Sequence, residues 1–301
     1  MFTGGEFDHS LGNFGRAEWI MSDIRTAVRS QAAISFERRL AELRGSASDL
    51  VRRAIDEVPL ALQHFFSQVS TNYTREPINY SVLLSQALHR GFEVAFATLN
   101  YETLLEQAAS KSIGHNWRKY GFQYKTDHWQ IAKLHGSVEW GYPWYAGGKF
   151  ADPIKALEET GLPTTLKREW IKTGLRDLVE PESGMVHYPA LALPIPSKAF
   201  VCPEEMEQDL QQFTKDCDGC LFIGYSGNDD DLSEFLKSNL PAKSLRVDIV
   251  SKGDVDEIAA KLRLIPQIAN FSYARDQFHT FNDGFTPFVE DSIDQVLEAY
   301  S

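Results

Sequence analysis

Residues 219–250, GCLFIGYSGNDDDLSEFLKSNLPAKSLRVDIV, give the clearest indication of the fold class. Its first residues, 219–224, form an apolar run bounded by glycines, and residues 229–238 carry apolar side chains at helical spacing. A second apolar run follows at 245–250. A strand, a helix and a strand in this order predict a parallel strand pair joined by a crossover helix.

The same alternation extends towards both ends of the chain. Further strands are predicted at 92–98, 129–134 and 190–195, and further helices at 101–110, 203–215, 253–263 and 286–299, with a less regular region at 139–190. Upstream, apolar spacing predicts helices over 16–45 and 46–69, then a polar loop at 71–81 and a short helix at 82–89. We therefore expect an α/β fold, a Rossmann-like doubly wound parallel sheet with an N-terminal helical block. A single domain, 1–301, would contain the helical block at 16–90 and the Rossmann-like core at 91–301.

Composition sets the broad class. The 301 residues are 43% hydrophobic and 24% charged, which suits one large globular domain. No apolar run approaches the roughly 18 residues of a membrane span, and the N-terminus lacks the basic flank and cleavage site of a secretory signal. We expect a soluble, cytoplasmic protein without membrane contact. The net charge of -12 disfavours direct nucleic-acid binding, because phosphates require a basic surface.

Polar side chains follow three of the predicted strands, at the position where open α/β sheets bind ligands. They lie in Thr98-Leu99-Asn100, in His135-Gly136-Ser137 and in Gly224-Tyr225-Ser226. Each also has an ordinary structural explanation. Asn100 could form a turn or cap a helix, His135 could be a buried structural histidine, and Ser226 or Asn228 could cap the following helix.

Taken together, these motifs resemble those of the sirtuin-like domains, in particular the bacterial branch that hydrolyses NAD in antiphage defence. Sirtuins carry T-Q-N-I-D, H-G and G-T-S at successive strand ends. This chain has T-L-N-Y-E at 98–102, L-H-G-S at 134–137 and G-Y-S at 224–226. The resemblance extends over 92–251 and includes A-L-P-I-P-S-K-A-F-V-C-P at 192–203.

The resemblance implies a chemistry that suits these residue types. Cleavage of the nicotinamide–ribose bond passes through an oxocarbenium-like state, as glycoside hydrolysis does. Asn100 would orient water or the ribose hydroxyls, since an amide both donates and accepts hydrogen bonds. His135 would act as the general base, because an imidazole titrates near neutral pH.

The resemblance also implies a set of NAD contacts. Glu102 occupies the position of the sirtuin aspartate near the nicotinamide, with one additional methylene. The remaining candidate contacts are Thr98, Gly224, Ser226 and Ser251.

The cysteines depart from the sirtuin deacetylase pattern, which holds zinc with two C-x-x-C pairs after the histidine. Residues 136–201 contain no cysteine. Cys217 and Cys220 have the spacing of half a zinc site, but Cys202 is the only other cysteine in the chain, so core packing is preferred. We expect no metal. Without the zinc module, hydrolysis or cyclisation of NAD is favoured over protein deacetylation.

The N-terminus departs from the family as well. Sirtuin-like domains usually begin with a strand and a G-A-G loop whose amides bind the diphosphate. Gly4 and Gly5 match the start of such a loop, but Glu6 replaces the third small residue. Either the chain starts inside the motif and Gly4 and Gly5 contact the cofactor, or these residues form a frayed end.

Three functions remain open. The first is an NAD+ hydrolase that releases nicotinamide and ADP-ribose, acts as a defence effector and uses NAD as its substrate. The second is a non-catalytic NAD or ADP-ribose binding subunit of a larger complex. The third is an interaction subunit. The Asn100 and His135 pair favours the first. Such domains often form homo-oligomers or bind a sensor or nuclease subunit, and residues 16–69 are the candidate assembly surface, unless they simply cover one face of the sheet.

Overall fold

The computed structural model describes most of the chain. The described residues are 14–30, 36–46, 48–72, 78–114, 128–150, 152–162, 171, 175, 177–180, 182–195, 199–243, 245–269 and 278–300.

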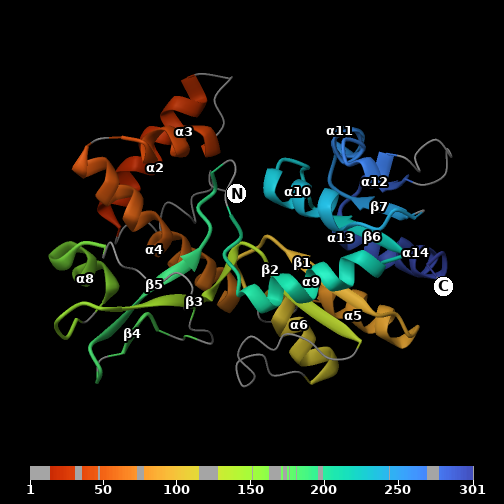
Figure 1. Cartoon of the computed structure of the whole chain (residues 1–301), viewed down its shortest axis with the longest axis horizontal. Helices are drawn as coiled ribbons and strands as arrows, with labels where there is room; N and C mark the ends of the chain where they lie inside the picture. The colour runs from red at the N-terminus through yellow and green to blue at the C-terminus, as the bar shows by residue number, and fades with distance from the viewer. Residues whose placement is uncertain are drawn as a thin grey trace.

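The N-terminal helical block consists of α2 (Gly15–Ser30), α3 (Phe36–Arg44) and α4 (Asp49–Asn72). These helices pack on one another and stand beside the antiparallel strands at the left of Figure 1. The long helix α4 buries an apolar face that includes Val58, Leu62 and Phe66, as its helical spacing predicts. The predicted helical block is confirmed, and α5 (Ile78–His89) follows it.

The strands that the apolar runs predict are parallel. Strand β1 (Val94–Thr98) pairs with β2 (Trp129–Lys133), and β6 (Gly219–Ile223), β7 (Arg246–Val250) and β8 (Phe278–Phe281) form a second parallel group in that order. The helices between and after them are α6 (Leu104–Ile113), α9 (Glu204–Asp216), α10 (Asp230–Asn239), α11 (Val255–Leu262) and α12 (Pro266–Ala269). The fold is therefore mixed α/β with parallel sheets, as expected.

An antiparallel sheet occupies the region expected to be irregular. It has the order β3 (Gly136–Tyr145), β5 (Met185–Leu191) and β4 (Val179–Glu180), with α8 (Pro153–Thr160) beside it. The expectation for 139–190 was therefore wrong, and the strand predicted at 190–195 lies at 185–191. The reason is that β3 is buried on both faces and contains Pro143, so it shows neither the alternation nor the composition typical of a strand.

The chain's last described residues pack along the second parallel group, from Phe281 at the end of β8 to Gly219 at the start of β6. They form α13 (Phe285–Pro287), a π-helical turn (Phe288–Ser292) and α14 (Ile293–Glu298). Phe288, Val289 and Val296 pack with Leu83 and Ala87 of α5 in a hydrophobic cluster. This arrangement matches the helix predicted at 286–299.

A large cavity lies between the two parallel groups. Its volume is about 1660 Å³, and every residue of β1 and every residue of β6 lines it. Successive side chains of a strand point to opposite faces, so a strand that lines a cavity along its whole length presents its backbone edge to it. The cavity therefore separates the edge of β1 from the edge of β6, and at the carboxyl ends of these strands it is lined by Asn100 and Gly224.

Candidate functional site

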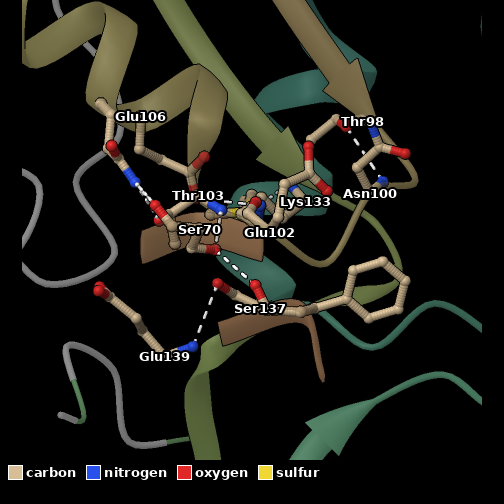
Figure 2. A network of polar contacts seen from close by, with 12 residues as sticks. Ser70, Thr98, Asn100, Glu102, Thr103, Glu106, Lys133, Ser137 and Glu139 are labelled. Carbon is tan, nitrogen blue, oxygen red and sulfur yellow. Dashed lines mark hydrogen bonds and ion pairs between the residues drawn. The ribbon is translucent and has the colours of Figure 1, made fainter. Parts of the chain in front are cut away.

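Asn100 lies in a short loop between β1 and α6 and does not cap the helix. The N-cap of α6 is Thr103, three residues further on. The backbone N–H of Asn100 donates to Thr98 Oγ1 at 3.1 Å, which fixes the loop (Figure 2). The side chain is exposed, lines the cavity and hydrogen-bonds to Tyr80. Burial raises the pKa of Tyr80 to about 12, although the bond with Asn100 acts against this, so Tyr80 is a neutral phenol beside the amide.

His135 is held at the end of β2 by the glycine that follows it. Gly136 has φ +88°, and a Cβ added there would overlap the carbonyl oxygen of Ala190. This close approach of β5 lets the N–H of Ala192 donate to the His135 carbonyl at 2.8 Å. The imidazole is only 4% exposed and lines the cavity.

Asp229 is the acidic neighbour of this imidazole. Its Oδ2 lies 3.1 Å from His135 Nε2, which is within ion-pair distance. The angle between the two groups does not allow a hydrogen bond, and Nε2 makes none to any other described residue. Asp229 is also the N-cap of α10, because its Oδ1 accepts the N–H of Leu232 at 2.9 Å. The suggestion that Ser226 or Asn228 caps this helix was wrong. An acidic residue at the first position of the helix predicted at 229–238 was the signal for the N-cap role.

The third strand end is a tight turn after β6. Gly224 has φ +62°, and its N–H donates to the Val250 carbonyl at 2.8 Å. Ser226 is exposed and lines the cavity. Lys261 Nζ donates to the Ser226 carbonyl at 3.3 Å and to Asn228 Oδ1 at 2.7 Å, so α11 supports the turn from behind.

A buried ion pair connects the first two strand ends. Lys133 Nζ lies 3.0 Å from Glu106 Oε1 and donates to the Glu102 carbonyl at 2.6 Å (Figure 2). Both charged side chains are fully buried. Burial raises the pKa of Glu106, whereas Lys133 lowers it. The pair fastens the loop that contains Asn100 to the strand that ends at His135.

The structure brings five of the predicted site residues to one cavity: Thr98, Asn100, His135, Gly224 and Ser226. Glu102 is buried at 8% exposure, and its carbonyl accepts Lys133. Ser251 donates its N–H to the Phe281 carbonyl at 3.0 Å, and neither it nor Glu102 is among the lining residues.

Gly4, Gly5 and Glu6 lie outside the described residues. Among the described residues, no group of three or more His, Cys, Asp or Glu side chains is arranged to hold a metal. Within the same residues, no helix combines the length and the apolar character needed to cross a bilayer.

These features define an α/β protein whose candidate site lies at the carboxyl ends of parallel strands. No family model and no curated protein matches the chain. The solved structures that align with it include two of the sirtuin (Sir2) type. One, described as "The Structural basis of Sirtuin Substrate Affinity", is 16% identical, with 73% of this chain and 69% of that chain covered and a TM-score of 0.40.

A second aligned structure is Sir2 in complex with the inhibitor EX-527, 2'-O-acetyl-ADP-ribose and a deacetylated p53 peptide. It is 16% identical, with 74% of this chain and 72% of that chain covered and a TM-score of 0.38. Sequence identities and TM-scores this low support no conclusion about activity.

Proposed function

We propose that the protein is an NAD+ glycohydrolase. The observation that carries this proposal is the buried imidazole of His135, whose Nε2 makes no hydrogen bond within the described residues and which lines the same cavity as the exposed amide of Asn100. A buried polar atom without a hydrogen bond is costly in a structural role, and such groups gather at functional sites. A ligand hydroxyl or a water molecule would satisfy it.

The proposed reaction adds water to NAD+ and yields nicotinamide, ADP-ribose and a proton. Asn100 orients the water or the ribose hydroxyls, since its amide offers both a donor and an acceptor. His135 removes the proton, and Asp229 at 3.1 Å stabilises the imidazolium that forms. A positive imidazolium beside a carboxylate gains most where water is excluded, and His135 is nearly inaccessible.

The turn at Gly224 and Ser226 is the proposed dinucleotide contact. Gly224 carries no side chain and has an open space around its Cα, so a ligand can approach the backbone closely. Thr98 belongs to the same contact set, and so do Glu102, Ser251, Gly4 and Gly5 on the strength of the sequence motifs alone. No metal takes part in this proposal.

The proposed activity also has a consequence for the cell. An NAD+ hydrolase depletes a shared resource, so its activity has to be restrained, and we propose a cytoplasmic defence effector whose helices α2 to α4 mediate assembly with copies of itself or with a sensor or nuclease subunit. Concentration-dependent sedimentation of the purified protein tests the self-assembly.

Nicotinamide release by the purified protein tests the catalytic proposal. Asn100→Ala and His135→Ala should each reduce it by at least about 100-fold. Two control variants make the same substitutions outside the cavity: Asn239→Ala on α10 and His89→Ala at the exposed end of α5. Both should retain full activity. Circular dichroism establishes that each variant is folded.

The outcome separates the three functions. Retained turnover in folded Asn100→Ala or His135→Ala contradicts the assignment of these residues. Binding of NAD or ADP-ribose without any turnover by the native protein supports the non-catalytic binding subunit, and neither binding nor turnover supports the interaction subunit.

A further inference from the structure

Two cysteines meet at the amino end of β6, the opposite end of this strand from the candidate site. Cys217 is the C-cap of α9 and has an extended backbone, with φ -63° and ψ 147°. Cys220 is the second residue of β6. Both are free thiols of intermediate exposure, and both line the cavity. A solvent-filled cavity would give small molecules access to them.

The backbone between the two thiols is held in place by a polar network. A Cβ on Gly219 would overlap the ring of Tyr300, so this ring packs directly on the glycine. The hydroxyl of Tyr300 donates to the Cys220 carbonyl at 3.2 Å and to Asp248 Oδ2 at 2.7 Å. Asp248 is fully buried and accepts two hydrogen bonds from Arg246, at 2.8 and 3.0 Å. These contacts hold the backbone around Cys220 in one position.

The two thiols hydrogen-bond to each other, and their pKa values shift in opposite directions. A hydrogen bond between the two side chains lowers the pKa of Cys217 and raises that of Cys220, and nearby Lys243 lowers the pKa of Cys217 further. Lys243 is itself anchored over this segment, donating to Asp218 Oδ1 at 2.8 Å and to the Asp216 carbonyl at 3.0 Å. A thiolate stabilised in this way is the attacking group in thiol–disulfide exchange.

Cys202 provides an internal comparison. Burial raises its pKa to about 12, with Glu207 adding repulsion, so its thiol stays protonated at neutral pH. A metal is the other common partner of C-x-x-C spacing, but no third ligand lies near enough among the described residues.

We propose that Cys217 and Cys220 form a redox-active dithiol that is oxidised to a disulfide by low-molecular-weight disulfides such as glutathione disulfide. The Cys217 thiolate attacks one sulfur of the oxidant, forms a mixed disulfide and releases one thiolate. The Cys220 thiol then loses its proton to that thiolate and attacks the Cys217 sulfur, which releases the second small group as a thiolate. This thiolate takes up from water the proton that Cys217 lost on ionisation. Two electrons pass from the protein to the oxidant, and two small thiols are formed. This site is independent of the proposed hydrolase activity.

The test treats the full chain with glutathione disulfide and follows it by intact mass and peptide mapping. We expect the native protein to lose two hydrogen atoms and to yield a Cys217–Cys220 cross-linked peptide. Cys220→Ser should stop at a stable glutathione adduct on Cys217, because the resolving thiol is absent. Cys217→Ser should form neither product, and the matched control Cys202→Ser should behave as the native protein does.

The same protein in graded glutathione redox buffers should show a reversible transition, with the cross-link lost on addition of reduced glutathione. Three results would overturn the proposal: no cross-link in the native protein, an adduct that persists on Cys217 when Cys220 is present, or equal modification of Cys202.

Discussion

Replacement of Asp229 by asparagine separates its two roles. Asp229 caps α10 through Oδ1, and asparagine is an equally good N-cap, so we expect the helix and the melting temperature to be retained. The charge beside His135, however, is lost. An opposite charge within about 4–6 Å shifts a pKa by about 1–3 units, and each unit is 1.36 kcal/mol, or a factor of about ten in rate. We therefore expect nicotinamide release to fall by about 10- to 1,000-fold.

Asp152 offers a matched control for this change. It is the N-cap of α8 and accepts the N–H of Lys155 at 2.8 Å, but it does not line the cavity. Asp152→Asn should leave both the melting temperature and the turnover unchanged. Asp229→Ala should also destabilise the protein by about 1 kcal/mol, because the cap is removed. Unchanged turnover in folded Asp229→Asn would show that this carboxylate does not assist His135.

Three further predictions concern stability, and chemical or thermal denaturation measures each of them. Lys133→Met or Glu106→Leu alone should cost about 3–5 kcal/mol, because a buried charge loses its partner, whereas the double variant should cost clearly less; additive losses would contradict the pairing. Gly136→Ala should prevent stable folding, since its methyl group would overlap the Ala190 carbonyl at positive φ, and a native melting temperature would contradict this. Burial raises the pKa of Glu57, so its carboxyl group stays protonated to higher pH in the folded protein than in the unfolded chain. The free energy of unfolding of the protein therefore falls as pH rises above about 4.3. Glu57→Gln should remove that fall and be more stable than the native protein at pH 7, with the difference vanishing in acid; a difference that does not depend on pH would contradict the shift.

The helices, the parallel strands and the polar residues that follow the strands could be predicted from the order of residues. Short apolar runs such as GCLFI at 219–223 are strands in the structure, and all five residues of this strand are partly buried, which favours apolar side chains on both faces. Gly136 and Gly224 have a different cause. Both have a positive φ, a backbone conformation that favours glycine, so the residue type itself marks these two turns.

Which of these residues lie close together depends on the packing of the whole chain. Asp229 is 94 positions from His135 in the numbering of the chain, and nothing local to either residue predicts a separation of 3.1 Å between their side-chain atoms. The pairing of β3 with β5 was hidden as well, because a strand buried on both faces and interrupted by a proline shows no alternating pattern. The cavity between β1 and β6 likewise depends on how the two parallel groups are placed, since strand edges carry no signature in the order of side chains. Periodicity records the environment of each segment, whereas a site is made by contacts between segments, and those are fixed only when the whole chain is packed.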